Sequence, residues 1–444
     1  MSKGSLKLFS SDAKDLRKRI LFTLFVLGIY ALGTGITIVW AAPWLGSLYS
    51  ELDFLGVFNL MSGGGFEKFA IFGLGVTPYI NASIVTQLLT MDIIPYFKEL
   101  KEQGYVGRQK INRITRYLGI ILAFIQAYVL TVFLLGVNDV SMILKITLVM
   151  TAGTSFLLWL GDQITNKGIG NGQSLLIMAS IVLSLPAVFT GAYNVFIGAG
   201  TYANWVGIIF FAAYLIMYLL VIVGIVWITL AERRIPIQYA NKTVSAYGAK
   251  QSYLPLRINY AGVMPVIFAS MLLTIPSIVV TIIGNQNAID FVNKYIMYTS
   301  VPGFILYIAL IVFFSYFYTF MAMNPEEMSK DLNKSGAYIP GVRPGAETTK
   351  YISNVVGRLT LVGSLFIAIL AGMPILISNL TGLPQSVAIG GTGILIVVGV
   401  AIETYKQVQS GLVSRKYSSR RRNSWKTWFF LLLLPLAREL SVNY

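Results

Sequence analysis

The stretch FNLMSGGGFEKF (58–69), which continues into AIFGLGVTPYINASIVTQLLTMD (70–92), decides how the rest of the sequence is interpreted. Its first part carries three consecutive glycines at 63–65, followed by a Glu–Lys pair. Three glycines remove the helix propensity that a lipid-facing span needs. An irregular backbone survives at membrane depth only where protein buries it or where it lines a watery cavity. The stretch therefore indicates a broken membrane span. An interfacial loop that leads into an ordinary helix is the alternative.

The second part of this stretch is apolar but interrupted by polar side chains. These are Thr77, Asn81, Ser83, Thr86 and Gln87. A half-span that is broken and then polar on one face is typical of a pore lining rather than of a lipid anchor.

The composition is that of an integral membrane protein with several spans. The 444 residues are 56% hydrophobic and only 12% charged, against about 25% charged residues in soluble domains. The apolar run 20–40 is long enough to remain in the membrane, so no cleavable signal peptide is expected. Hydropathy predicts ten spans, at about 20–40, 70–91, 114–136, 144–161, 172–191, 205–229, 260–283, 302–323, 355–378 and 386–404.

The basic residues predict the orientation of these spans. All but Lys68, Lys145 and Lys294 of the 34 Lys and Arg fall on the side of the N-terminus. Lys and Arg concentrate in cytoplasmic loops. Both termini are therefore expected in the cytoplasm, which agrees with an even number of spans.

Two loops on the basic side, 230–259 and 324–354, are too polar to enter the bilayer and too long to be simple turns. In the second loop, two Pro–Gly pairs flank Arg343 and predict a tight tip that presents the guanidinium outward. A solvated turn is the alternative interpretation. Two such loops on one face favour a docking surface for a large partner.

The residue types that are absent exclude most enzyme classes. The chain has no Cys and no His, so we expect no thiolate or imidazole chemistry, no metal site and no cofactor. No Walker A motif is present, and the Gly-x-Gly-Asp pattern of intramembrane aspartyl proteases is incomplete at 159–162. The sequence predicts a protein that is not an enzyme. A secondary solute transporter with broken helices remains the alternative, although the spans are nearly free of ionisable residues.

Several motifs resemble the SecY family, the channel subunits of the bacterial Sec protein-translocation complex. They occur in order along the chain: GVTPYINASIVTQLL (75–89), GYVGRQKINRITRY (104–117), GIGNGQSLLI (168–177), AERRIPIQYA (231–240), SYLPLRINYAGVMPVIFAS (252–270), NPEEMSKDLNKSGAYIPGVRPG (324–345) and GGTGILIVVGVAIETYKQVQ (390–409).

The resemblance implies an all-α integral membrane fold of ten transmembrane helices. They would form two inverted, pseudo-symmetric five-helix halves, 20–191 and 192–404, around a central pore. The broken second span would form a plug at about 58–69. A basic cytosolic arm (1–19) and a basic tail (405–444) complete the chain. The tail departs from the family through a short apolar segment at 428–437, which resembles a signal-sequence core or an interfacial anchor.

The resemblance also assigns roles to single residues. It implies an aliphatic pore ring of Ile80, Ile84, Ile177, Ile267 and Ile396. It implies a plug built from Met61, Ser62, Gly63, Gly64, Gly65 and Phe66. It implies that Arg233, Arg234 and Arg343 bind a cytosolic partner. A lateral gate is expected at Asn81, Thr86 and Gln87. Gln173 stands where the family usually carries an aliphatic residue, so the ring has a polar member if this side chain faces the constriction.

The resemblance implies a function and partners as well. We expect a protein-conducting channel of the bacterial cytoplasmic membrane that translocates unfolded secretory polypeptides and releases membrane segments laterally into lipid. The expected partners are SecE, SecG, the SecA motor ATPase, the ribosome, and the signal peptides of preproteins. No direct nucleic-acid function is expected beyond contact with ribosomal RNA.

Overall fold

The computed structural model describes residues 14–41, 59, 61–90, 94–135, 139–198, 204–239, 252–283, 285–298, 300–381 and 393–410. Most of the predicted basic arm and the apolar segment 428–437 lie outside the described residues.

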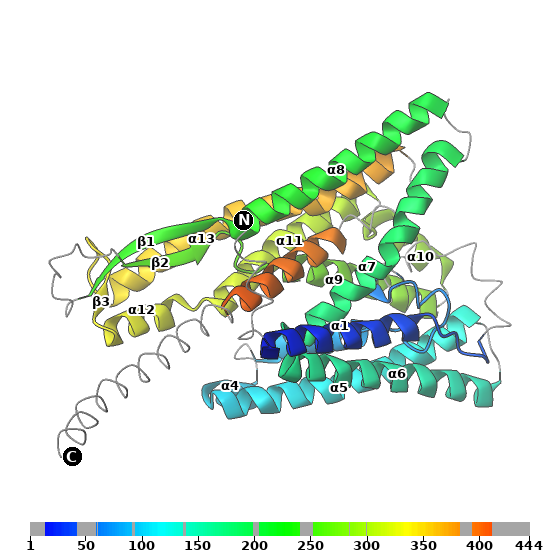
Figure 1. The fold of residues 1–444 in the computed structure, drawn as a ribbon, viewed down its shortest axis with the longest axis horizontal. Helices are drawn as coiled ribbons and strands as arrows, with labels where there is room; N and C mark the ends of the chain where they lie inside the picture. Colours follow the sequence, from blue (N-terminus) through cyan, green and yellow to red (C-terminus); the bar gives the residue numbers. More distant parts are fainter. Residues whose placement is uncertain are drawn as a thin grey trace, which may run out of the picture.

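Helices make up most of the described chain (Figure 1). They are α1 (Lys14–Thr34), α3 (Thr77–Leu89), α4 (Pro95–Glu102), α5 (Tyr105–Leu135), α6 (Val140–Lys167), α7 (Gly172–Tyr193), the π-helix η5 (Asn194–Gly198), α8 (Asn204–Leu230), α9 (Met264–Ile283), α10 (Gln286–Tyr295), α11 (Val301–Ala322), α12 (Pro325–Lys334), α13 (Ala346–Thr381) and a last helix over 393–410.

Each of the ten predicted spans overlaps one of these helices: α1, α3, α5, α6, α7, α8, α9, α11, α13 and the helix 393–410. Within the described residues, six helical stretches are long and apolar enough to cross a membrane. The predicted fold, a helical protein with several membrane spans, is confirmed.

The second span is shorter than hydropathy predicts. It was expected over 70–91, but the chain forms turns as far as Val76 and α3 begins at Thr77. Gly75 takes a φ of +57°, which breaks the helical path, and Pro78 is placed in the first turn of α3. Proline fits there because the first N–H groups of a helix have no intrahelical partner.

The helices pack in two groups. In the first group α5 packs on α3 and α6, while α1 and α6 both contact α7. In the second group α11 packs on α9 and α13, and α13 also contacts α8. The helix α7 and η5 lead from the first group to α8 in the second (Figure 1).

A small antiparallel sheet lies beside the N-terminal part of α13 (Figure 1). Its strands are β1 (Glu232–Tyr239), β2 (Ser252–Arg257) and β3 (Ala337–Tyr338), in the order β2-β1-β3. Alternate β1 residues Ile235 and Ile237 are buried in one cluster with Ile352 and Val356 of α13. The two polar loops predicted at 230–259 and 324–354 therefore contain strands that pair with each other and add a small sheet to the helical fold.

Candidate functional site

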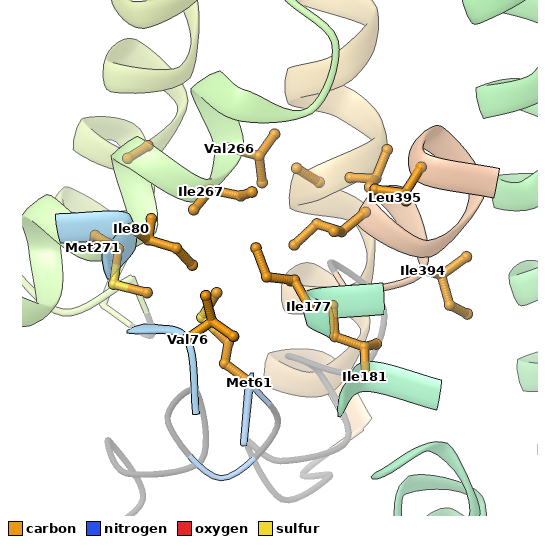
Figure 2. Packing of buried hydrophobic residues seen from close by; sticks show 14 of the residues in the cluster. Met61, Val76, Ile80, Ile177, Ile181, Val266, Ile267, Met271, Ile394 and Leu395 are labelled. Atoms are coloured by element: carbon orange, nitrogen blue, oxygen red, sulfur yellow. The ribbon is translucent and has the colours of Figure 1, made fainter. Parts of the chain in front are cut away.

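Four isoleucines from four separate helices meet in one buried cluster. Ile80 comes from α3, Ile177 from α7, Ile267 from α9 and Ile396 from the helix 393–410. Figure 2 shows Ile80, Ile177 and Ile267 arranged around a common centre, with Met61 and Val76 beside them. Ile84, one turn after Ile80, is partly buried and packs against the same cluster. The structure therefore brings the five predicted ring residues into one apolar region.

This region is chemically inert. The cluster contains no Lys, Arg, Asp or Glu, and none of these four residue types is buried anywhere in the described residues. Aliphatic side chains offer no ligands that replace an ion's hydration shell, and a narrow aliphatic passage dewets when it is empty. The arrangement suits a seal that holds back ions without binding any particular side chain.

The side chain of Gln173 is directed toward α6. Its side-chain Nε2 donates a hydrogen bond of 3.2 Å to the carbonyl oxygen of Leu158 in α6. Its amide occupies the space next to Gly161, where a Cβ atom would collide with it. The polar group that the sequence placed near the ring is instead used to join α7 to α6.

The segment between residues 59 and 67 forms a closed, hydrogen-bonded loop. The side chain of Asn59 donates to Glu67 Oε2 at 2.9 Å and accepts from the backbone N–H of Glu67 at 3.1 Å. Inside the loop, the Ser62 hydroxyl accepts from the backbone N–H of Phe66 at 2.8 Å. Gly63 and Gly64 take φ values of +71° and +79°, a region in which glycine avoids the Cβ penalty.

This loop is packed at both ends. Met61 belongs to the cluster of the four isoleucines, whereas Phe66 and Phe69 belong to a second cluster with Ile146 and Met150 of α6. Between these ends Gly63 lies so close to the backbone of Ser180 in α7 that a Cβ atom would be 3.2 Å from its carbonyl oxygen. Of the predicted plug residues, Met61, Ser62, Gly65 and Phe66 are buried.

A pair of backbone hydrogen bonds holds the end of the loop. The N–H of Ile38 donates to Phe69 O, and the N–H of Ile71 donates to Ile36 O, both at 3.0 Å. These bonds make an antiparallel bridge between Thr37 and Ala70. The segment is therefore attached to the chain that follows α1 just before α3 begins.

The three predicted gate residues of α3 differ in their hydrogen bonding. The hydroxyl of Thr86 donates to Ala82 O at 2.7 Å, within the same helix. Gln87 Nε2 donates to Ser83 Oγ at 3.2 Å, and its Oε1 is buried without a partner among the described residues. Asn81 is half-buried. Gln87 thus keeps an acceptor that a neighbouring element can use.

The neighbouring arginines of β1 face opposite sides of the sheet, as strand alternation requires. Arg234 lies on the face of Glu232, to whose Oε1 it donates two hydrogen bonds of 3.1 Å. Its guanidinium also lies 4.9 Å from the ring centre of Tyr253 in β2. Arg233 shares the opposite face with Ile235, which is packed toward α13. The two residues that were predicted as one docking pair therefore have different surroundings.

Arg343 is exposed at the tip between β3 and α13. Gly341 and Gly345 take φ values of +83° and +102°. The hydroxyls of Thr348 and Ser329 donate to Arg343 O and Gly345 O at 2.8 and 3.0 Å. The turn is held at its backbone, and the guanidinium is free to meet a partner.

Sequence reasoning missed a pocket of about 390 Å³ between β1 and α13. Arg233 and Arg358 both line it. The alternation in ERRIPIQY (232–239) was a signal for the strand that positions Arg233, but the segment was interpreted as a polar loop.

Comparison with known proteins identifies close relatives. A family model described as SecY matches residues 70–405. The protein translocase subunit SecY of Bacillus licheniformis is 42% identical over 418 residues, which cover 91% of this chain and 96% of the relative. The subunit of the same name from Bacillus subtilis is 42% identical over 420 residues, covering 92% and 97%.

Solved structures of the same fold are more distant in sequence. One, described as the structure of a protein conducting channel, is 20% identical with a TM-score of 0.65, covering 90% of this chain and 93% of that one. Another, Sec61 in a canine ribosome-channel complex from the endoplasmic reticulum, is 18% identical with a TM-score of 0.63 and the same coverages.

Proposed function

Because the chain belongs to the SecY family, it is a protein-translocation channel of a membrane, and we propose that unfolded polypeptides cross it through the aliphatic cluster around Ile80, Ile177 and Ile267. The observation that carries this proposal is the convergence of these side chains from three helices (Figure 2). Ile84 and Ile396 complete the proposed ring. The family assignment replaces the alternative of a solute transporter.

The closed loop at 59–67 is the proposed plug of this pore. Met61 shares the buried cluster of the ring, so the loop seals the passage from one side in the resting state. Displacing the loop separates Met61 from the ring. Residues beyond Gly65 stay attached more firmly, because Phe66 and Phe69 pack on α6 and a backbone bridge follows.

Lateral release of membrane segments is proposed to occur beside α3. Polar contacts between membrane helices average only about 0.6 kcal/mol, so a hydrophobic signal helix can replace them. Of the gate residues, Asn81 and Gln87 are proposed as the stronger members. The hydroxyl of Thr86 bonds within its own helix, whereas Gln87 Oε1 has no partner among the described residues.

The proposed membrane is the bacterial cytoplasmic membrane, with both termini in the cytoplasm, as the distribution of Lys and Arg favours. In this orientation Arg343 and Arg234 present a docking surface to the cytosol. Arginine suits bidentate contact with phosphate or carboxylate, and the ribosome and the SecA motor are the proposed partners there. SecE and SecG are the proposed membrane subunits. The chain itself is proposed to carry out no chemical step.

Reconstitution tests this function directly. The chain is placed in liposomes with SecE and SecG, and SecA, ATP and a secretory precursor are added outside. We expect the precursor to become protected from protease, and the protection to require ATP and an intact signal peptide. Saturable uptake of a small solute without any precursor protection would contradict the proposal.

A further inference from the structure

We propose that the pocket between β1 and α13 binds the phosphate of an anionic phospholipid, with an acyl chain along the adjoining face of α13. The pocket measures about 390 Å³ and is lined by two arginines, Arg233 and Arg358, which belong to elements far apart in the sequence. The assignment of the lipid to the cytosolic leaflet rests on the orientation proposed above.

The two guanidinium groups are available to an anion. Both arginines are exposed, and no carboxylate of the described residues lies within ion-pair distance of either one. In contrast, Arg234 on the other face of β1 is paired with Glu232, and Arg116 is paired with Asp162. Two unpaired arginines at one pocket suit the oxygens of a phosphate, which each planar guanidinium contacts with two parallel hydrogen bonds.

Packing of the sheet directs Arg233 to this place. Ile235 and Ile237, which share its face of β1, are buried in a cluster with Ile352 and Val356 of α13. The strand is therefore fixed against the helix, and Arg233 lies at the end of this contact. Figure 1 shows β1 and β2 running alongside this part of α13.

The α13 side of the pocket changes from polar to apolar along the helix. Tyr351 and Asn354 come first, then Arg358, and then Leu359 and Val362. Spacings of three, four, seven, eight and eleven residues keep these side chains on one helical face. The order matches a lipid, whose polar head group precedes its hydrocarbon.

The pocket lies at the depth where head groups are expected. The exposed apolar side chains of α13 begin with Leu361 and Val362 and recur at Leu365, Ile369, Met373 and Leu376. The lipid-facing part of the helix therefore starts about one turn after Arg358.

An anionic lipid fits this pocket better than a soluble anion or an acidic peptide does. Val355, Leu359 and Val362 give it an apolar wall, and Val362 is 56% exposed at a depth that the bilayer occupies. A soluble anion leaves that wall uncovered, whereas a phospholipid covers the wall and the arginines together.

Native mass spectrometry of the purified channel complex tests the proposal. The complex is equilibrated with phosphatidylglycerol, or with phosphatidylcholine, and the retained lipids are counted. We expect the Arg233→Gln/Arg358→Gln variant to retain phosphatidylglycerol with at least about tenfold lower affinity, which is about 1.4 kcal/mol. Arg234→Gln removes one positive charge, against two in the double variant, from the opposite face of β1. It is the control, and we expect it to retain the lipid as the wild type does.

A second variant and a competitor distinguish a bound phospholipid from a bound soluble anion. Val362→Asp, which keeps both arginines, is also expected to lose phosphatidylglycerol. Glycerol phosphate in excess is expected not to displace the lipid, and displacement would overturn the proposal in favour of a soluble anion. Equal retention by the double variant and Arg234→Gln, or equal retention of phosphatidylcholine, would also overturn it. Since lipid retention is measured without translocation, failure here leaves the channel function standing.

Discussion

At the scale of single residues, the most important feature is that isoleucines from different helices lie together, which the sequence of any one helix does not show. Ile80 and Ile84 share a helical face by their spacing of four. In the sequence, however, they look like any apolar residue of a membrane helix. Ile177, Ile267 and Ile396 lie far away along the chain, so no local period links them to Ile80. Only the family resemblance selected these five. The structure places four of them in one apolar cluster, with Ile84 packed against it.

A polar substitution in this cluster is predicted to make the channel leak. Ile177→Ser replaces a buried aliphatic side chain by a hydroxyl. Full burial of an aliphatic side chain corresponds to about 1.5–3 kcal/mol of transfer free energy. Since 1.4 kcal/mol is a factor of ten, we expect the resting ion conductance in planar bilayers to rise about tenfold.

Val182→Ser is the control for this substitution, because Val182 is on the same helix but 45% exposed. We expect its resting conductance to equal that of the wild type. A leak of the same size in both variants would mean that the substitutions perturb α7 as a whole. It would contradict a specific effect on the ring.

The sequence does not determine whether Gln173 belongs to the ring. The family position suggested a ring member, but the amide bonds to Leu158 O instead. Gly172 approaches Gly161 so closely that a Cβ atom on it would collide with the Gly161 carbonyl oxygen. Such small residues allow membrane helices to come close together. Such a contact depends on how the two helices are placed relative to each other. No local pattern in the sequence predicts that placement.

At the scale of elements, hydropathy predicted where the spans lie but not where each begins. The second span begins at Thr77 because the preceding segment, although apolar, folds into turns. Hydropathy measures affinity for lipid and is insensitive to backbone conformation. The sheet was missed for a related reason, since β1 and β2 lie in a loop that is polar on average. Its alternating Ile235 and Ile237 become meaningful only when α13 is present to cover them.

The closed loop at 59–67 is predicted to depend on its Asn59–Glu67 clamp. Asn59→Ala removes two hydrogen bonds that close the loop. Their net contribution is about 1 kcal/mol, because both groups are exposed to competing solvent. A change of this size alters the population of an open loop about fivefold, so we expect the frequency of transient channel openings to rise by about that factor.

Lys68→Ala is the matched substitution for the clamp, since Lys68 is an exposed residue beside the same loop. We expect the channel with Lys68→Ala to show the same frequency of transient openings as the wild type. Identical opening frequencies for Asn59→Ala and Lys68→Ala would show that the clamp does not hold the loop. Deletion of Gly63–Gly65 is a stronger change and is expected to raise the leak further.

At the scale of the whole molecule, the chain forms two groups of helices that meet around the aliphatic cluster. Ile80 and Ile177 come from the first group, Ile267 comes from the second, and Ile396 comes from the helix 393–410. A passage lined by both groups widens when they move apart, while α7, η5 and α8 keep them connected. The composition and the charge distribution indicated the membrane class and the orientation. The aliphatic cluster could not be predicted in the same way, because its side chains come from both groups of helices and meet only in the folded chain.

Crosslinking of an arrested precursor to the ring is the most direct measurement of the channel's path. The chain contains no cysteine, so Ile80→Cys, Ile177→Cys and Ile267→Cys each carry a single thiol. A precursor with one cysteine is arrested in the reconstituted channel and oxidised. We predict a disulfide-linked product at all three ring positions and none at Val182→Cys. A precursor that is translocated normally but reacts with none of the three ring cysteines would contradict the proposed path.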